Sequence, residues 1–425
     1  MSRRQLFVYH ESKRVGILRE DENALLHFTY DPDWNRDKEA FPLCLAMALR
    51  DESYGGKLVT SFFENLIPEG EQRRQIEQFA GLPQGDDAAY LERFGEDCAG
   101  AFSLSVHPTH SVPPDKAPEF HVPFKAIESS IAKGLPISTV LSQDGELLPF
   151  SLAGAQAKFP CRINDGLIYL PGGKEPTTHI VKLPIRSGEK LLDSVENEYL
   201  SMRLAKLCGL NVPEVALVGD SIPLFVIERF DRQATLHEVH RIHTQDFCQA
   251  LGRPSSEKYE KHGGPSFSEC YVLLQNHSSD VARDLFALLD WIGFNLALGN
   301  NDSHAKNISL VLSRNGIRLA PFYDLICTAL YPQYNAHFAF KIAEVTSWDK
   351  ITRSRMDAFA RQCGLRGNFV ISRWLRLFDR MKVGFAELKH ESTANKHLQK
   401  TVRKIGQELE KRISSLSKNL QNESY

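Results

Sequence analysis

The chain has 425 residues, of which 42% are hydrophobic and 24% are charged, as in an ordinary globular protein of two or three domains. The formal net charge of −2 excludes a strong overall attraction to nucleic acid, and we interpret the many Lys and Arg of residues 396–418 as a solvated helix face. The eight cysteines form no C-x-x-C pair, the N-terminus does not resemble a signal peptide, and the most apolar stretch is too short to span a bilayer. We therefore expect reduced core thiols and a cytoplasmic location.

Residues 1–108 form the first expected domain. We expect paired strands at residues 6–9 and 14–18, and a helix that starts at Ser61 and ends at Pro68. Four prolines between residues 107 and 118 are typical of a connector. The pattern leaves two interpretations of this domain open, a partner or regulatory module and a lid on the main domain.

Residues 119–230 are expected to form a small antiparallel sheet that carries one helix. Asn164-Asp165-Gly166 is a strong signal for a hairpin turn. For the helix, Asp193 and Glu196 resemble a capping box, and Gly209 is well placed as the C-terminal stop. Residues 149–159 are expected to form a strand, a tight loop and a second strand, and further strands are expected at residues 161–163, 167–170, 178–183, 214–218 and 224–228.

Residues 231–425 are expected to be mainly helical. Asp280 can cap a long helix, and further helical patterns cover residues 350–363, 368–388 and 396–420. A polar loop at residues 299–307 interrupts them. It is followed by an apolar strand at 308–312, a turn at Asn315-Gly316 and a second strand.

An acid, an amide five residues later, a hairpin and a second acid follow one another at Asp302, Asn307 and Asp324. In phosphoryl-transfer enzymes such a series supplies a base for the acceptor hydroxyl and ligands for Mg²⁺ on ATP. Oxygen ligands suit Mg²⁺, which binds through few carboxylates plus substrate phosphates. His304 lies two residues after the acid, whereas most protein kinases place a His or Tyr before it. The alternative interpretation is a polar loop that joins a helix to a strand.

Two further segments could bind a nucleotide. The small residues of loop 151–158 let backbone N–H groups approach phosphates, although a plain β-turn has the same composition. Lys182 points away from the side of Val181 and Leu183, so it could reach a cleft and pair with phosphates, with Glu198 as its acidic partner. A surface lysine on an edge strand is the alternative. Residues 227–232 either offer backbone groups to a flat base or form a charged loop.

In their order along the chain these motifs resemble the HipA family, the kinase toxins of bacterial HipBA-type toxin–antitoxin modules. Residues 62–66 and Gly100-Ala101 also look like the family's N-terminal subdomain, which in some relatives is a separate protein. The matching segments are residues 151–158, 177–184, 197–199, 228–232, 245–249, 254–256, 263–265, 302–307 and 321–324.

The resemblance implies an α+β, two-lobed protein-kinase-like fold with ATP in the cleft. The small antiparallel sheet lobe would be residues 119–230 and the helical C-terminal lobe residues 231–425, beside the additional N-terminal subdomain. Asp302 would be the base, and Asn307 and Asp324 would hold Mg²⁺. The implied nucleotide-binding residues are Ala153, Gly154, Ala155, Gln156, Ala157, Lys158 and Lys182 at the phosphates, Glu228, Arg229 and Phe230 at the adenine, and His304, Ala305, Lys306, Asn307, Tyr323 and Asp324 beside the metal and phosphates.

The resemblance also implies a serine/threonine protein kinase toxin that acts on a translation protein such as an aminoacyl-tRNA synthetase. A HipB-like helix-turn-helix antitoxin would neutralise it, and operator DNA would be contacted mainly through that partner. Ser151 stands where the family autophosphorylates. A phosphate there would add about −1.5 to −2 charges beside bound phosphate and favour an ejected loop.

Two rival functions remain open at this point. Lipid kinases also place a His two residues after the catalytic acid, so a lipid or small-molecule phosphotransferase is one rival, although no membrane-binding stretch supports lipid. The other rival is an inactive kinase-like co-repressor scaffold. Such a scaffold would need none of the side chains of Lys182, Asp302, Asn307 and Asp324.

Overall fold

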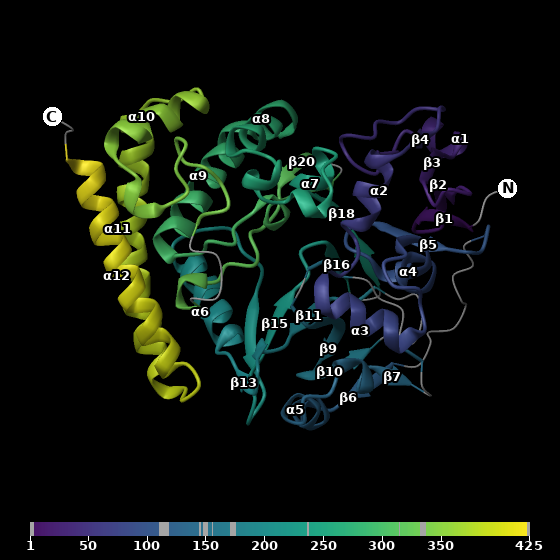
Figure 1. The fold of residues 1–425 in the computed structure, drawn as a ribbon, viewed down its shortest axis with the longest axis horizontal. Helices are drawn as coiled ribbons and strands as arrows, with labels where there is room; N and C mark the ends of the chain where they lie inside the picture. The colour runs from purple at the N-terminus through teal and green to yellow at the C-terminus, as the bar shows by residue number, and fades with distance from the viewer. Residues whose placement is uncertain are drawn as a thin grey trace. The chain divides into compact units, whose positions relative to one another are not determined.

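The computed structural model describes residues 4–109, 119–143, 146–147, 152–154, 156–170, 176–235, 238–313, 315–331 and 337–422 (Figure 1). The chain packs as two compact units. Unit 1 comprises Met1–Leu183 and Val218–Ser255, and unit 2 comprises Pro184–Leu217 and Ser256–Tyr425. Unit 1 therefore holds both the first expected domain and most of the second, while Pro184–Leu217 packs with the helical part of the chain. The three-domain division at 108, 119 and 230 stays a prediction.

The first sheet of unit 1 has the strand order β4-β3-β2-β1-β5. The predicted strand pair is confirmed as antiparallel β1 and β2, whose apolar side chains, among them Val8 and Val15, are fully buried. The helix expected from Ser61 to Pro68 instead spans Lys57–Glu64, so that prediction was wrong at both ends. Its N-cap is Gly56, which has a φ of 68° and no side chain that could cap the helix. The sequence therefore contains no capping signal at this helix start. The elements are β1 (Arg4–His10), β2 (Lys13–Glu20), β3 (Leu26–Tyr30), α1 (Pro32–Arg36), β4 (Tyr54–Gly55), α2 (Lys57–Glu64), α3 (Gly70–Ala80), α4 (Asp87–Phe94) and β5 (Phe102–Ser105).

The second sheet of unit 1 contains the strand order β15-β11-β9-β10-β6, with antiparallel neighbours throughout. The predicted hairpin is confirmed. Asp165 and Gly166 take φ values of 49° and 76°, which is the backbone that a two-residue type I′ turn requires. The elements are β6 (Phe120–Val122), α5 (Phe124–Ala132), β9 (Lys158–Asn164), β10 (Leu167–Leu170), β11 (His179–Lys182) and β15 (Leu224–Glu228), and β14 (Val215–Val218) lies at the boundary of the units.

Short elements complete this part of the chain. In unit 1 they are β7 (Ser142–Gln143), β8 (Glu146–Leu147), β16 (Arg232–Ala234), β17 (Val239–Arg241), β18 (His243–Asp246) and α7 (Phe247–Ala250), and in unit 2 they are β12 (Arg186–Ser187) and β13 (Lys190–Leu191).

Unit 2 is built around the long helix α9 (Val281–Leu298), which contacts α8, α11 and α12. Gly293 allows the closest approach, because a Cβ there would meet the Trp374 ring at 2.8 Å, and the Trp374 indole donates to Leu289 O at 2.9 Å. The predicted helices and hairpin are confirmed. They are α9 with its N-cap Asp280, α10 (Arg353–Gln362), α11 (Gly367–Glu391), α12 (Gln399–Gln421), β19 (Ser309–Ser313) and β20 (Gly316–Leu319). Unit 2 also contains α6 (Ser194–Leu207) and α8 (Phe267–His277), and α8 was not predicted from the sequence.

The capping box expected at the start of α6 is absent. Asp193 is the N-cap residue, but its carboxylate accepts from Thr401 Oγ1 at 3.0 Å and Lys404 Nζ at 2.8 Å on α12 instead of from its own helix. Burial raises the pKa of Glu196 to about 7. Tertiary partners therefore outcompete the local cap at this helix. The predicted stop at Gly209 is confirmed, with a φ of 81°.

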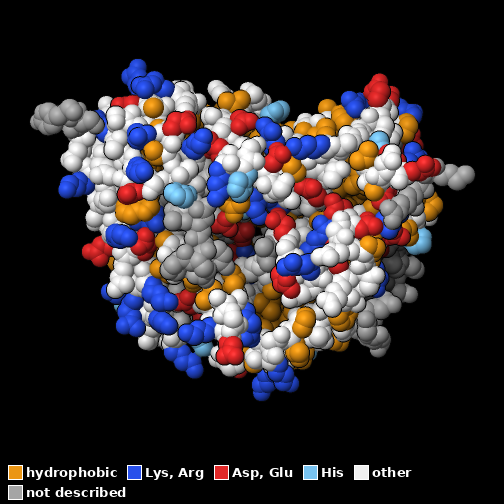
Figure 2. Space-filling model, viewed as in Figure 1, with side chains coloured by type: hydrophobic (Ala, Val, Ile, Leu, Met, Phe, Trp, Pro, Cys, Tyr) orange, Lys and Arg blue, Asp and Glu red, His pale blue; other side chains and the backbone are white. Residues whose placement is uncertain are grey.

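The basic C-terminal segment is a solvated helix face, as expected. Along α12 the apolar side chains, among them Val402, Ile405 and Leu409, are buried, while Lys400 and Arg403 are exposed. Figure 2 shows the Lys and Arg side chains gathered over the part of the surface where α12 lies in Figure 1. In the part of the chain that the structure describes, no helix combines the length and apolarity needed to cross a membrane. All eight cysteines are buried free thiols.

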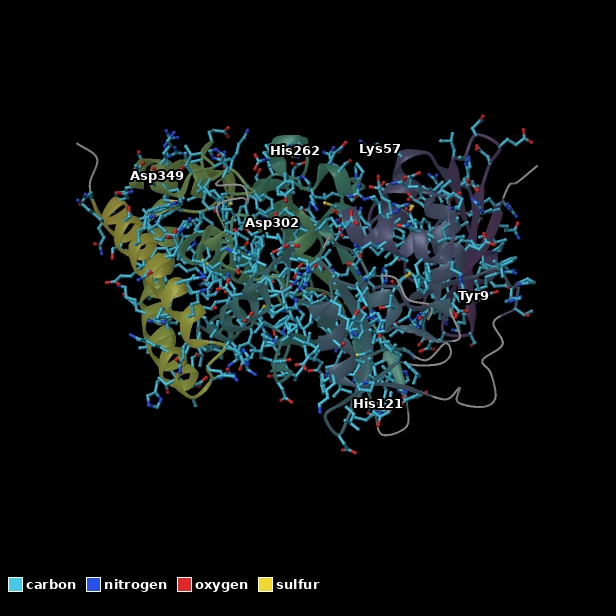
Figure 3. The ribbon with its side chains drawn as sticks, turned by 60° about the horizontal axis from the view of Figure 1, so that its bottom comes forward. Tyr9, Lys57, His121, His262, Asp302 and Asp349 are labelled. Atoms are coloured by element: carbon cyan, nitrogen blue, oxygen red, sulfur yellow. The ribbon has the colours of Figure 1, made fainter. Side chains whose placement is uncertain are left out.

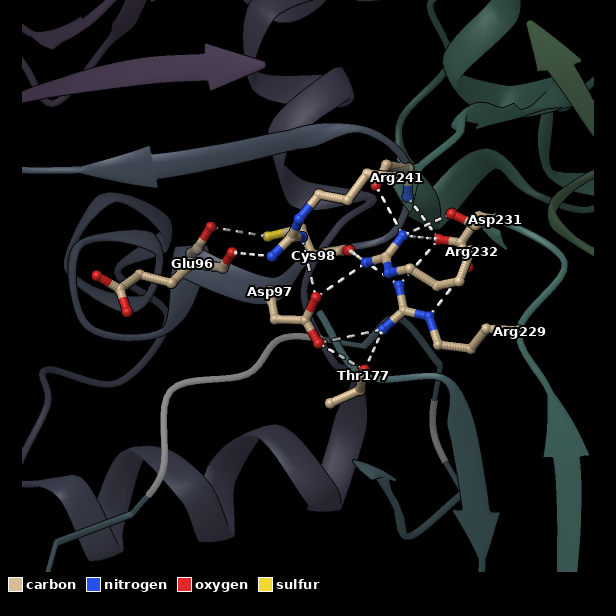
Figure 4. A network of polar contacts seen from close by, with 10 residues as sticks. Glu96, Asp97, Cys98, Thr177, Arg229, Asp231, Arg232 and Arg241 are labelled. Atoms are coloured by element: carbon tan, nitrogen blue, oxygen red, sulfur yellow. Dashed lines mark hydrogen bonds and ion pairs between the residues drawn. The ribbon is translucent and has the colours of Figure 1, made fainter. Parts of the chain in front are cut away.

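A buried ion-pair network joins the first sheet region of unit 1 to the second (Figure 4). Asp97 lies just before β5, while Arg229, Asp231 and Arg232 follow the end of β15. Asp97 accepts from Arg229 Nη1 at 3.3 Å, from Arg232 Nη2 at 2.9 Å and from Arg241 Nη1 at 2.9 Å. Asp231 receives both Arg229 and Arg232 at 2.9 Å. The guanidinium-bearing side chains of Arg229 and Arg232 are 1% exposed, so the network is out of contact with solvent.

Backbone groups complete the network. Cys98 O accepts from Arg229 and Arg232, Gly100 O accepts from Arg232, and Gly100 N donates to Asp231 at 2.8 Å. Burial by itself would raise the pKa of Asp97, but the charges of the three arginines outweigh it and hold that pKa well below its usual range. The segment 96–100 and the segment after β15 are therefore fixed together by charge-assisted hydrogen bonds.

Replacing Asp97 by Asn should destabilise unit 1 strongly. The substitution leaves buried arginines without their counter-charge, which costs roughly 3–5 kcal/mol. Because the folded-state pKa of Asp97 is depressed, its stabilisation is complete above its unfolded pKa of about 4 and is lost as pH falls further. Urea unfolding of the unaltered chain and of Asp97→Asn should give a difference in the free energy of unfolding that is largest at pH 7 and decreases below pH 4.

Asp37→Asn is the matched control, because its partner Lys13 is 53% exposed and such pairs contribute about 0–1 kcal/mol. Equal losses for the Asp97 and Asp37 variants would contradict the prediction.

Candidate active site

In unit 1 two lysines lie directly opposite each other on neighbouring strands. Lys182 on β11 pairs in register with Lys158 on β9 and with Phe225 on β15, so the three side chains share one face of the sheet. Lys182 is only 6% exposed, and its Nζ lies 5.8 Å from the centroid of the Phe225 ring. Two ammonium groups on one face of the sheet concentrate positive charge there. This part of the sheet is therefore suited to phosphates.

The described part of the loop before β9 is held from both sides within unit 1. Gly154 takes a φ of 108°, a Cβ there would meet Lys158 Nζ at 2.6 Å, and its carbonyl accepts from Glu69 N at 2.9 Å. Gln72 Nε2 donates to Lys158 O at 2.9 Å. Residues of the first sheet region, at the start of α3, thus fix the loop that the sequence assigned to phosphates.

The loop is also tied to the end of β11. Gln156 Nε2 donates to Leu183 O at 2.8 Å, and Leu183 N donates to Ala157 O at 3.0 Å. Ala153 is partly exposed. Ser151 and Ala155 lie outside the described residues.

The segment expected at the adenine has a structural side chain at its centre. Arg229 is committed to the buried network through its guanidinium, and its N–H donates to Thr178 O at 2.9 Å. Its carbonyl already accepts from Arg232 N at 3.3 Å, so Arg229 as a whole is part of the local structure. Glu228 is exposed at the end of β15 and Phe230 is half-buried, so these two remain candidates for adenine contact.

In unit 2 the catalytic-loop candidate begins where α9 ends at Gly299, which has a φ of 84°. Asn300 is 1% exposed and holds the loop in three directions. Its Nδ2 donates to Asn295 Oδ1 at 2.8 Å and to Asp324 O at 3.2 Å, and its Oδ1 accepts from Asp302 N at 3.2 Å. One buried carboxamide therefore links the backbones of the two predicted acidic residues.

Asn307 stands beside Asp302, as the spacing predicted. Its Nδ2 donates to Asp302 O at 2.9 Å, which leaves its Oδ1 as a possible metal ligand. Asp302 has an exposed side chain, whose Oδ1 accepts a hydrogen bond from the Tyr259 hydroxyl. Figure 3 labels Asp302 together with His262, whose ring also contacts Tyr259.

The remaining predicted residues of this loop are buried supports. His304 packs edge-on against the Tyr259 ring with centroids 5.0 Å apart, and Ala305 is fully buried. Lys306 is 7% exposed, and its carbonyl accepts from the Tyr323 hydroxyl at 2.7 Å. That hydroxyl also pairs with Ser309 Oγ at 2.6 Å, so Tyr323 joins the loop to the hairpin.

Asp324 adopts a φ of 54°, which is unusual for a residue with a side chain and is better tolerated by Asp and Asn than by most. Besides the bond from Asn300, a second buried carboxamide stabilises this segment. Asn197 on α6 donates to Cys327 O at 3.0 Å and accepts from Cys327 N at 2.9 Å. Glu198 follows it on α6 and is buried, and its pairing with Lys182 stays a prediction.

The donor set at Asn307 and Asp324 fits a magnesium nucleotide better than a free metal ion. Within the described ranges, no group of three or more His, Cys, Asp or Glu could hold a metal by itself. Mg²⁺ bound to a nucleotide takes only one or two protein oxygens and completes its shell with phosphates and water. One carboxamide oxygen and one carboxylate satisfy that requirement.

No role was assigned to Asn300, Asn197 or Tyr259 from the sequence. Asn300 could have been found, because an uncharged polar residue directly after a helix end is often a brace. Asn197 and Tyr259 could not, because their partners Cys327 and Asp302 lie 130 and 43 residues away along the chain.

A sheet with a buried lysine beside a small-residue loop, and a helical unit with the Asp302, Asn307 and Asp324 series, define a kinase-like α+β protein. Models of known families agree with this class. The model described as the HipA N-terminal domain matches residues 6–105, and that of the HipA-like C-terminal domain matches residues 150–412. The chain belongs to the HipA family, so the resemblance read from the motifs is confirmed.

Individual relatives cover most of the chain. Y4mE of Sinorhizobium fredii, named as an inferred kinase, is 36% identical over 390 residues, which are 89% of this chain and 90% of that one. The serine/threonine-protein kinase toxin HipA of Shewanella oneidensis is 30% identical over 395 residues, 88% of this chain and 87% of that one. A solved complex of HipA, HipB and operator DNA from Shewanella oneidensis contains a chain with a TM-score of 0.84 at 26% identity, covering 99% of this chain and 100% of that one. The expected fold class is confirmed.

Replacing Lys182 by Met should weaken ATP binding and leave the fold intact. Loss of a charge-assisted contact to phosphate costs about 1.5–3 kcal/mol, or about ten- to more than hundredfold in affinity. Titration calorimetry with Mg-ATP measures the effect. Lys125→Met, at an exposed position of α5, is the control, and equal affinity of the Lys182 variant and the unaltered chain would remove Lys182 from the site.

Proposed function

We propose that the chain is a Mg²⁺-dependent serine/threonine protein kinase that transfers the γ-phosphoryl group of ATP to a protein. The observation that carries the proposal is the buried Asn300 carboxamide, which bonds to Asp302 N and Asp324 O at once. A general base and a metal ligand must be held at a fixed separation for phosphoryl transfer, because catalysis of this reaction consists mainly of positioning and charge stabilisation. A scaffold without activity would have no need of this brace.

Each part of the chain has a defined task in this mechanism. Lys158 and Lys182 would bind phosphate oxygens, and Asn307 and Asp324 would hold Mg²⁺, which supplies positive charge beside the phosphates when it is bound. Asp302 accepts the proton of the acceptor hydroxyl while the oxygen of that hydroxyl bonds to the γ-phosphorus. The bond from that phosphorus to the bridging oxygen breaks, and ADP leaves with the electron pair.

The acceptor class and the partners follow from the relatives. We propose a translation protein such as an aminoacyl-tRNA synthetase as substrate, in keeping with the kinase toxin among the relatives. We also propose a HipB-like helix-turn-helix antitoxin that carries the chain to operator DNA, in keeping with the solved complex. The net charge of −2 supports DNA contact made mainly by the antitoxin. Eight buried free thiols support action in the cytoplasm.

Asp302→Asn tests the proposed activity. The purified chain, given radiolabelled ATP, Mg²⁺ and a bacterial lysate, should label a protein of synthetase size. The variant should retain its fold and its ATP affinity while turnover falls by roughly 10²–10⁴, the usual contribution of a general acid–base group.

Asp379→Asn, exposed on α11, is the matched control for loss of one carboxylate. Label in the lipid or small-molecule fraction would instead establish the rival phosphotransferase, and near-normal turnover by the Asp302 variant would reject its role as base.

Ser151→Ala tests the proposed self-inactivation. If Ser151 is the autophosphorylation site, the variant should lose self-labelling and keep its phosphorylation of other proteins. Phosphorylation of Ser151 would place about −1.5 to −2 charges beside the nucleotide phosphates, so the unaltered chain should lose activity during incubation with ATP and the variant should not. Mass spectrometry of the incubated chain that always finds Ser151 unmodified would contradict the switch.

A further inference from the structure

We propose that Tyr259 positions the catalytic base by fixing the carboxylate of Asp302. This inference rests on the proposed kinase function and names a residue to which the mechanism above gives no task. The Tyr259 hydroxyl donates to Asp302 Oδ1 although the two residues are 43 positions apart in sequence. Asp302 is exposed, so without such a contact its carboxylate would sample several orientations in solvent.

Tyr259 itself is held firmly by the catalytic loop. Its ring lies edge-on to His304 at 5.0 Å, with an interplanar angle of 89°. The neighbouring Lys258 accepts through its carbonyl from Ala305 N at 3.3 Å. Two successive residues of the segment thus contact two successive residues of the loop that contains Asp302.

The turn after Tyr259 restricts it further. Gly264 N donates to Tyr259 O at 3.0 Å, and a Cβ on Gly264 would lie 2.0 Å from Glu257 O, so the chain closes there around a glycine. On the other side Glu260 accepts from Lys341 N at 2.8 Å. The phenol therefore approaches Asp302 from a braced segment and not from a loose loop.

This contact divides the work of the two carboxylate oxygens. Oδ1 accepts from the phenol, and Oδ2 is left to accept the proton of the acceptor hydroxyl. A base that is already oriented avoids an ordering cost in the transition state, and misplacing a catalytic group by about 1 Å can reduce rate by about 100-fold. The loss should fall on turnover, because the phenol contacts the proposed base and the loop that carries it.

The test is Tyr259→Phe, which removes the hydroxyl and keeps the ring that packs on His304. We expect kcat for protein phosphorylation to fall about 10- to 100-fold, with KM for ATP unchanged. The ¹³Cγ resonance of Asp302, assigned by its loss in Asp302→Asn, should shift in Tyr259→Phe without ATP present. Tyr54→Phe is the matched control, since its hydroxyl donates to Ala48 O at 2.8 Å in the first sheet region, and it should change neither quantity.

The outcomes separate this inference from the proposed function. An unmoved Asp302 resonance, or an unchanged kcat, would overturn the positioning role. A rise in kcat/KM for the protein acceptor would also overturn it, because Tyr259 would then be a block that acceptors displace. If the unaltered chain transfers no phosphate, the proposed function fails, and the carbon shift still decides whether Tyr259 holds the carboxylate.

Discussion

Unit 1 depends on one buried ion-pair network, in which Asp97 and Asp231 pair with the arginines at 229, 232 and 241. Removing charged groups from water costs several kcal/mol for each, so a network of this kind persists only if every member keeps its partners. Here the partners come from the segment before β5 and the segment after β15. The first sheet region cannot shift against the second without exposing an uncompensated charge. The sequence left open a partner or regulatory module and a lid on the main domain, and the network adds that this region is fixed to the second sheet of unit 1.

The same region reaches the loop that we assign to the phosphates. Glu69 N donates to Gly154 O within the loop, and Gln72 donates to Lys158 O at its C-terminal end. The position of Lys158 on β9, opposite Lys182 on β11, is therefore supported by Gln72, which lies 86 residues earlier in the chain. In unit 2 asparagines perform the corresponding task, since Asn300 and Asn197 hold the segments that carry Asp302 and Asp324. In unit 2 the supporting side chains are thus uncharged carboxamides, which add no charge to the segments that they hold.

Local signals were sufficient for most elements. The hairpin at Asp165-Gly166 and the helix stops at Gly209 and Gly299 follow from backbone geometry that few residues besides glycine adopt easily. Prediction failed where a distant partner decided the outcome. Asp193 is placed as a helix cap, but its carboxylate pairs with Lys404 on α12. Arg229 belongs to a buried ion-pair network. Tyr259 bonds to Asp302, which lies 43 residues away along the chain. The chemistry-bearing series 302–307 was recognisable because its spacing is itself local, whereas the groups that orient it are not.

The left-handed backbone of Asp324 has a practical consequence for dissecting the site. A residue with Cβ pays about 1 kcal/mol or more for this region of φ and ψ, and Asp and Asn recover part of that cost by bonding to their own main chain. An alanine introduced at 324 would lose the carboxylate that we propose as a metal ligand, and it would also push the segment held by Asn300 and Asn197 toward another conformation. Loss of activity in Asp324→Ala could then result from a displaced loop as well as from the missing carboxylate. Asp324→Asn keeps the backbone preference and removes only the charge.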